Sequence, residues 1–230
     1  MGVQKFLGYN LAENQKVLSM MGPSGTGKSF SADFVKEFLD YKVAKQITTR
    51  APRPDDKHYS YMSPEEFVKL EQEGKILGYY SGDRKTLQGG NGYGYLVEEV
   101  MDQLSSDSKL ILFPSAYELL QRSFKIQYGT TDKIGLGFKN PQSVYDRAMQ
   151  CNKVLDEAEL ADRIRVSKNL TQIMEDYNKN GDDSSFHLIY SDGGGENISE
   201  SKRIQLSGIV ESMGYAPSDF EGGIEEYISR

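Results

Sequence analysis

The sequence has few of the residues from which several common functional sites are built. It contains one cysteine, Cys151, so no internal disulfide can form, and only two histidines, His58 and His187. A zinc site made of cysteine and histidine ligands is therefore excluded. Residues 1–15 hold no apolar core of signal-peptide length, and no apolar run reaches the ~18 residues of a membrane-spanning helix. These absences predict a cytoplasmic protein that contacts no membrane.

Basic residues are also fewer than acidic ones. The 230 residues include 27 lysines and arginines against 34 aspartates and glutamates, which gives a net charge of −7. A protein that coats DNA or RNA neutralises phosphates with an excess of basic side chains, so no nucleic-acid partner is expected. A local basic pocket stays compatible with this composition. With 15 tyrosines and 10 phenylalanines, the chain has too many aromatic residues for a disordered protein.

Short apolar segments alternate with amphipathic ones along most of the chain. This alternation predicts an α/β domain with a largely parallel sheet. The expected strands cover residues 17–21, 42–47, 109–113, 134–138 and 186–190. The first expected helix begins at Lys28. The second begins at Pro64 with Ser63 as its N-cap, and the second and later helices are expected at 64–72, 96–104, 115–124, 141–152, 157–177 and 199–213. Residues 1–16 are predicted to be an extension, and residues 215–230 a polar, partly disordered tail.

The clearest motif is a glycine-rich phosphate loop. Residues 22–29 match G-x-x-x-x-G-K-[ST] at every fixed position, and they are Gly22, Pro23, Ser24, Gly25, Thr26, Gly27, Lys28 and Ser29. Glycines let the backbone curl so that successive N–H groups point at phosphate oxygens, and the following helix adds its positive N-terminal end. We expect Lys28 to reach the phosphates of ATP and Ser29 to offer its hydroxyl to Mg²⁺. An ordinary strand-to-helix turn would not explain why Lys28 and Ser29 follow Gly27 directly.

A second basic cluster follows the phosphate loop and its helix. Arg50 and Arg53 lie three residues apart in a proline-rich segment, with Tyr59 and Tyr61 close behind them. Two guanidinium groups at this spacing suit a second phosphate group, and tyrosine hydroxyls would complete the shell of that phosphate. The same residues also fit a solvated loop with two surface arginines, so both interpretations stay open at this point.

Together these residues resemble the guanylate kinase family. The resemblance rests on GPSGTGKS at 22–29, TTRAPRP at 48–54, HYSYMSPEEF at 58–67 and GYG at 92–94, and it extends over residues 17–213. It implies a three-layer P-loop α/β fold with a parallel-sheet core, a monophosphate-binding insertion at about 48–94 and a helical lid at about 141–177. It also implies transfer of a phosphoryl group from ATP to a nucleoside monophosphate, with Mg²⁺ as cofactor.

The resemblance assigns roles to individual residues as well. Lys28 and Ser29 match the family's contacts to the ATP phosphates and to Mg²⁺. The positions that hold the phosphate of the acceptor are matched by Arg50, Arg53, Tyr59 and Tyr93. The cationic positions of the lid, which would close over the transferring phosphoryl group, are matched by Arg147, Lys153 and Arg163. Lys28, Arg50 and Arg163 are thus the expected catalytic residues.

The sequence departs from the family where guanine is recognised. The family has carboxylates at the positions of Gly78 and Ser115, and a serine at the position of Gln46. Two groups that accept hydrogen bonds from guanine are therefore missing, which predicts relaxed or altered base specificity. Phe113 stands where the family has an acid near Mg²⁺, and Glu118 is a candidate to replace that acid through water.

Three functions stay open on these grounds. The first is phosphorylation of a nucleoside monophosphate by ATP, with GMP or dGMP as the default acceptor. The second is a P-loop kinase for another phosphorylated small molecule, such as a sugar phosphate. The third is a guanylate-kinase-like binding module without catalysis. The intact phosphate loop favours an enzyme, while neither the acceptor nor the oligomeric state follows from the sequence.

Overall fold

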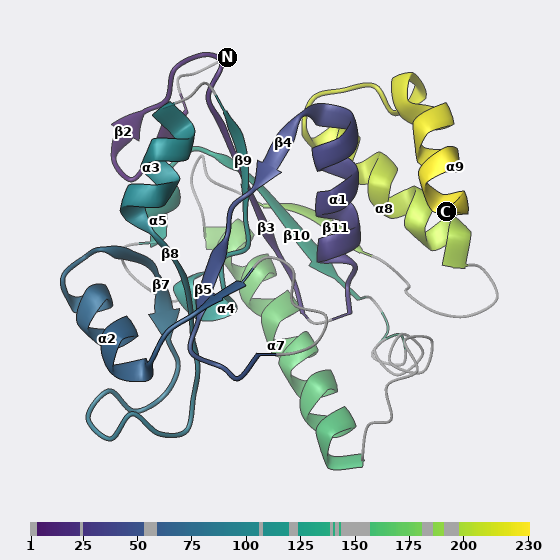
Figure 1. Ribbon diagram of the computed structural model, residues 1–230. Helices are drawn as coiled ribbons and strands as arrows, with labels where there is room; N and C mark the ends of the chain where they lie inside the picture. Colours follow the sequence, from purple (N-terminus) through teal and green to yellow (C-terminus); the bar gives the residue numbers. More distant parts are fainter. Residues whose placement is uncertain are drawn as a thin grey trace. The chain divides into compact units, whose positions relative to one another are not determined.

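The computed structural model describes residues 4–23, 25–52, 59–105, 108–119, 124–138, 140, 143, 157–180, 186–190 and 198–230 (Figure 1). Five strands form one sheet in the order β11-β10-β3-β9-β4. The pairs β10–β11, β3–β9 and β4–β9 are parallel, which confirms the predicted α/β fold. These strands are β3 (Lys16–Met21), β4 (Tyr41–Val43), β9 (Lys109–Leu112), β10 (Asp132–Gly137) and β11 (His187–Tyr190).

The chain divides into two compact units, each of which is described separately. One consists of Met1–Ser19 and Tyr41–Thr131, and the other of Met20–Asp40 and Asp132–Arg230. In the first unit, the predicted insertion contains a four-stranded sheet of order β6-β5-β8-β7. Its strands are β5 (Gln46–Thr48), β6 (Tyr59–Tyr61), β7 (Ile76–Tyr80) and β8 (Gly92–Leu96), and the single strand predicted at 42–47 is instead the two strands β4 and β5.

Helix α2 (Pro64–Gln72) covers one face of the four-stranded sheet. It begins as predicted: the Ser63 hydroxyl accepts a hydrogen bond from the Glu66 N–H at 3.1 Å, and Pro64 stands in the first turn. Phe67 and other apolar side chains of this helix form a core cluster with those of the sheet. Gly92 allows the close approach, because a Cβ there would lie 2.8 Å from the Phe67 ring. The opposite face of the sheet therefore remains for other contacts.

Residues 4–16, predicted as an extension, fold onto the first unit. Strands β1 (Lys5–Phe6) and β2 (Tyr9–Asn10) form a hairpin whose two turn residues have positive φ, as a type I′ turn requires. Phe6 is fully buried and its ring meets the Tyr128 ring edge-on at 6.1 Å. The remaining helices of this unit are α3 (Val97–Ser105), α4 (Ala116–Leu119) and α5 (Phe124–Tyr128).

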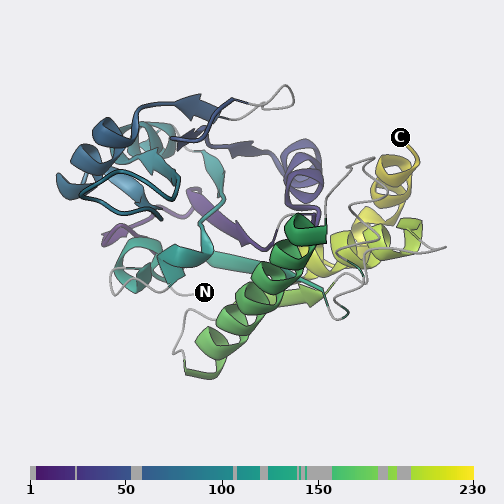
Figure 2. The ribbon, with the colours of Figure 1, turned by 90° about the horizontal axis from the view of Figure 1, so that it is seen from below.

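In the second unit, helices cover both faces of the β10–β11 pair (Figure 2). These helices are α7 (Glu157–Asn180) and α8 (Ile198–Ser212). Gly135 and Leu188 are paired and face Met174 of α7. The next pair, Leu136 and Ile189, points the other way, and Ile189 contacts Gly208 of α8. Side chains of these strands thus alternate between the two helices; β10 is buried from Lys133 on, whereas β11 is half-buried from Leu188 on.

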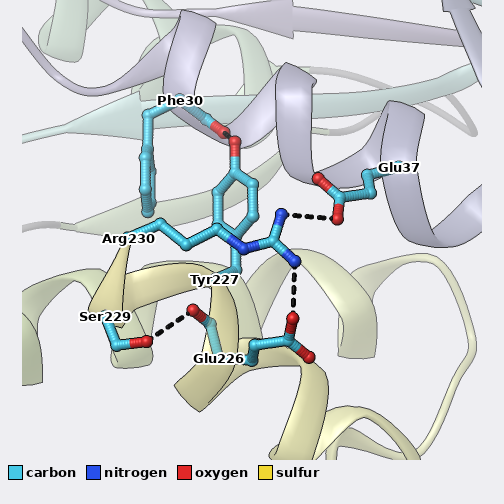
Figure 3. A network of polar contacts seen from close by, with 6 residues as sticks. All are labelled: Phe30, Glu37, Glu226, Tyr227, Ser229 and Arg230. Atoms are coloured by element: carbon cyan, nitrogen blue, oxygen red, sulfur yellow. Dashed lines mark hydrogen bonds and ion pairs between the residues drawn. The ribbon is translucent and has the colours of Figure 1, made fainter.

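The segment 215–230 is helical, so the prediction of a partly disordered tail is wrong. It forms η1 (Pro217–Phe220) and α9 (Glu221–Ser229), which pack on α8. Tyr227 of α9 lies over the aromatic stripe of α1 (Lys28–Leu39), with ring centroids 5.1 Å from Phe30 and 5.4 Å from Phe34. Its hydroxyl donates to the Phe30 carbonyl at 3.2 Å, and Arg230 pairs with Glu37 at 2.8 Å (Figure 3). The burial that these aromatic residues gain outweighs the poor helix propensity of two glycines in α9.

Candidate active site

The phosphate loop lies in the second unit, between β3 and α1. Gly22, Gly25 and Gly27 have φ values of 152°, 88° and 82°, a region that favours glycine. A Cβ at Gly22 would lie 2.4 Å from the Leu136 carbonyl oxygen, so only glycine fits against β10. The Thr26 hydroxyl donates to the Pro23 carbonyl at 2.8 Å and closes the curl. Ser24 lies outside the described residues.

The N-terminus of α1 has the features of an anion-binding site. Its N-cap is Gly27, which has no side chain to cap the helix, and no acidic residue stands in the first turn. The first N–H groups of a helix have no partner within it, and the helix dipole adds a partial positive charge there. Ser29 is exposed in this first turn. The residues present therefore fit a phosphate group, as the motif predicts.

Lys28 occupies the loop that it is expected to serve. Its ammonium group donates to the carbonyls of Gly22 and Pro23, at 2.7 and 2.9 Å. Burial lowers the pKa of Lys28 to about 8, because no carboxylate among the described residues offsets the loss of water around the charge. A phosphate in the loop would offer this ammonium group a charged acceptor in place of two neutral carbonyls.

Gln205 of α8 supports the phosphate loop and was not indicated by the sequence. The side chain is 1% exposed, and its Nε2 donates to the Thr26 carbonyl at 3.0 Å and to the Ser31 hydroxyl oxygen at 2.6 Å. Periodicity could not have revealed it, because Gln205 lies among the buried apolar residues of α8 and carries no motif of its own.

In the first unit, three residues predicted to bind the acceptor phosphate lie on adjoining strands. Tyr59 belongs to β6, Arg50 follows β5, and Tyr93 belongs to β8. The Arg50 guanidinium carbon lies 4.7 Å from the centroid of the Tyr59 ring. Thr48 pairs with Tyr93, and both point away from the face that α2 covers. Arg53, the fourth predicted residue, lies outside the described part of the chain.

Hydrogen bonds fix the end of β5 against β8. The Thr48 hydroxyl and the Thr49 N–H both donate to the Gly92 carbonyl, at 2.9 and 3.1 Å. In return the Gly92 N–H donates to the Thr49 hydroxyl at 2.8 Å. This reciprocal set prevents a register slip and sets where Arg50 leaves the strand. The two threonines before the arginine thus have a structural reason to be there.

Two positions that the resemblance matches to the family's guanine-binding groups, Gly78 and Gln46, make contacts within the protein. Gly78 pairs with Gly94, and a Cβ at Gly78 would lie 2.4 Å from the Gly94 Cα, so no side chain fits. Gln46 donates to the Phe113 carbonyl at 3.0 Å. The Phe113 N–H donates to the Tyr95 hydroxyl at 2.6 Å. The backbone of Phe113 is therefore satisfied on both sides by neutral groups.

Glu118 is a structural carboxylate and does not stand at a surface where water would link it to a metal. It is 2% exposed and accepts hydrogen bonds from the Ser115 N–H and, at 2.7 Å, from the Tyr128 hydroxyl. Its own N–H donates to the Ser115 carbonyl at 3.1 Å, so the two residues form a reciprocal helix cap. Burial raises the pKa of Glu118 to about 7. The prediction that Glu118 assists Mg²⁺ through water is therefore wrong, because the carboxylate is buried and already accepts two hydrogen bonds.

The long hairpin loop at 81–91 is held by one ion pair. The Arg84 guanidinium donates twice to Glu71 of α2, at 2.9 and 3.2 Å, and lies 4.9 Å from the Tyr79 ring centroid. Asp83 accepts from the N–H groups of Lys85 and Thr86. These contacts are those of a structured surface loop, since its arginine is already engaged with Glu71 and Tyr79.

The side chains of the three residues predicted for the lid lie outside the described part of the chain. Arg163 lies in α7, but its side chain is outside the described part, as are Arg147 and Lys153 altogether. Among the described residues, no three His, Cys, Asp or Glu side chains gather into a metal-binding group. No helix in this part of the chain is both long and apolar enough to span a membrane.

Comparisons with known proteins agree with this geometry. No family model matches the chain. A guanylate kinase of Fusobacterium nucleatum subsp. nucleatum is 32% identical over 94 residues, which are 40% of this chain and 48% of that protein. A guanylate kinase of Hyphomonas neptunium is 35% identical over 65 residues, which are 26% of this chain and 30% of that protein. The matched region thus spans about half or less of these relatives.

The fold match is broader. The crystal structure of guanylate kinase from Anaplasma phagocytophilum superimposes with a TM-score of 0.52 over 88% of this chain and 89% of that one, at 16% identity. Such low identity carries information about the fold alone. The chain thus has a guanylate kinase-like fold, and part of its sequence is similar to guanylate kinases.

Proposed function

We propose that the chain transfers the terminal phosphoryl group of ATP to a nucleoside monophosphate. The observation that carries this proposal is the phosphate loop, where an uncapped and acid-free helix N-terminus stands beside the Lys28 ammonium group. This arrangement suits the triphosphate of ATP, and the exposed Ser29 hydroxyl suits the Mg²⁺ that accompanies it. The sequence matches to guanylate kinases support a kinase over an unrelated P-loop protein.

The first unit supplies the acceptor side of the proposal. Tyr59 of β6 and Tyr93 of β8 lie on the sheet face that α2 leaves uncovered, and Arg50 follows β5, the strand between them, with its guanidinium near the Tyr59 ring. A guanidinium with two phenolic hydroxyls can hold a monophosphate by charge-assisted hydrogen bonds. Catalysis in this reaction class is mainly positioning and charge stabilisation, which phosphate-binding residues supply.

The base of the acceptor is left open. The residues that the resemblance matches to the family's guanine-binding positions are Gly78, Ser115 and Gln46, and none is a carboxylate. GMP and dGMP therefore stand as the default acceptors only because of the family resemblance. A phosphorylated small molecule other than a nucleotide, or ATP binding without transfer, are the competing functions.

One assay separates these functions. ADP release from ATP and Mg²⁺ is measured with GMP, dGMP, AMP, CMP, UMP, dTMP and a panel of sugar phosphates as acceptors. We expect turnover with at least one nucleoside monophosphate, and a loss of about 100-fold or more in kcat/KM for Lys28→Ala and Arg50→Gln. Lys45→Gln, which changes an exposed lysine just before β5, is the matched control and should keep the parent rate. Transfer only to a sugar phosphate, or ATP binding without any transfer, would refute the proposal.

A further inference from the structure

Gln205 is a buried amide that contacts the phosphate loop from behind. It stands on α8, yet its Nε2 lies 3.0 Å from the Thr26 carbonyl oxygen and 3.5 Å from that of Gly27. The same nitrogen donates to the hydroxyl oxygen of Ser31, a fully buried residue of α1. One side chain therefore joins α8 to both the loop and the helix that follows it. The ribbons of α1 and α8 lie side by side (Figure 1).

The orientation of one peptide depends on this contact. A phosphate loop works only if its N–H groups point inward, which turns its carbonyls outward into the protein. A buried carbonyl needs a donor, or its desolvation is uncompensated. The peptide between Thr26 and Gly27 is planar and trans, so its N–H points opposite to the carbonyl that Gln205 binds. Gly27 has a φ of 82° and no Cβ, so this peptide has little else to keep it from flipping.

We propose that Gln205 is a positioning residue of the phosphate loop: it holds the Thr26 carbonyl outward and thereby keeps the Gly27 N–H available for phosphate. The inference rests on the proposed function to the extent that the loop binds nucleotide phosphates. Gly27 and Gln205 also fit each other sterically. A Cβ on Gly27 would lie 2.9 Å from Nε2, so the amide occupies the space that this glycine leaves free.

Packing alone does not account for an amide at this place. The Oε1 atom of Gln205 is buried and has no hydrogen-bond partner among the described residues. Methionine would fill nearly the same volume without leaving a buried polar atom unpaired. The unpaired oxygen is the consequence of placing a nitrogen donor against the loop. A residue that only joined α8 to α1 would not need that donor.

The test compares nucleotide affinity with stability in two variants of similar shape. Gln205→Met removes the donor, and Gln205→Glu places a carboxylate against the Thr26 carbonyl. The dissociation constant of ADP is measured by calorimetry, together with the midpoint of urea unfolding. We expect ADP to bind about 10-fold more weakly to Gln205→Met and more weakly still to Gln205→Glu, while the acceptor KM stays at the parent value. Ile204→Met, a change at an exposed neighbour on α8, should leave both quantities unchanged.

The outcomes separate positioning from packing. If Gln205→Met lowers the unfolding midpoint but binds ADP like the parent, Gln205 only packs and the inference is overturned. If Gln205→Glu fails to fold, the Gln205→Met comparison decides alone. A parent that binds ADP but phosphorylates no monophosphate refutes the proposed function and leaves the Gln205 comparison valid. A parent that does not bind ADP overturns both.

Discussion

The ammonium nitrogen of Lys28 lies 2.7 Å from the Gly22 carbonyl oxygen, inside the loop where a phosphate is expected. The side chain is thus held by neutral acceptors before any nucleotide arrives. Burial nevertheless lowers the pKa of Lys28 to about 8, since no carboxylate in the described part of the chain offsets the loss of water around the charged form. Binding of an anionic phosphate reverses the balance, because it favours the charged form.

Nucleotide binding is therefore predicted to take up a proton at alkaline pH. Above pH 8 the free protein loses the Lys28 proton, whereas the ADP complex keeps it, so the affinity for ADP falls as the pH rises. The phosphates of ADP are already ionised at pH 8.5 and do not contribute. Calorimetric titrations at pH 8.5 in two buffers of different ionisation enthalpy measure the uptake directly. Lys28→Arg, whose charge does not titrate in this range, should show none, and ADP binding to the parent without uptake would contradict the assignment.

Glu118 makes the stability of the protein depend on pH in an unusual direction. Burial raises its pKa to about 7, against an ordinary value of about 4.3. Between these values the folded protein holds a proton that the unfolded chain has released, so stability falls as the pH rises from roughly 4.5 to 7. This pKa shift corresponds to about 3 kcal/mol of folding stability, which is present at low pH and is lost above pH 7.

Glu118→Gln should remove this slope, because the amide does not titrate. Urea unfolding at pH 5 and pH 8 gives the free energy of unfolding for both proteins. We expect the variant to lose less stability than the parent between the two values. Glu65→Gln, at an exposed position in the first turn of α2, is the control and should keep the parent slope. Equal slopes for Glu118→Gln and the parent would show that the carboxylate is ionised throughout.

No side chain fits at Gly78, where the resemblance implies a carboxylate that binds guanine. Any Cβ there meets the Gly94 Cα and the Tyr93 carbonyl oxygen, both at 2.4 Å, and these are backbone atoms that do not move aside. Gly78→Ala should therefore cost about 1–3 kcal/mol of stability, and Gly78→Glu at least as much. Thermal unfolding measures the effect. Gly222→Ala in α9, where a Cβ has open space, is the control and should be neutral or stabilising. A stable Gly78→Ala protein would mean that β7 and β8 are less closely paired.

The sequence indicated those parts of the molecule whose local signals are strong. Ser63 and Pro64 predicted the start of α2, and the glycine pattern predicted the phosphate loop. The strands of the insertion were missed in part because β5 and β6 have three residues each, and because four of the five residues of β8 are glycine or tyrosine. None of the three therefore has a clear two-residue period of polar and apolar residues. Gln205 could not be found for a different reason: its role exists only when α8 is packed against a loop far away in sequence. Short-range patterns carry no information about such a contact.

Short-range sequence patterns did not predict helix α9 (Glu221–Ser229) either, and its contribution to stability can be measured. Three phenylalanines of α1 are covered by Tyr227, which comes from a segment with two glycines and several acidic residues. Tyr227→Phe removes only the hydrogen bond to the Phe30 carbonyl and should cost about 0.5–1.5 kcal/mol. Tyr227→Ala also removes the ring contacts and should cost about 2 kcal/mol or more, the half-buried share of a full aromatic truncation. Urea unfolding gives both values, and Tyr215→Phe, at an exposed tyrosine before η1, is the control. If Tyr227→Ala were no more harmful than Tyr227→Phe, α9 would not be docked on α1 in solution.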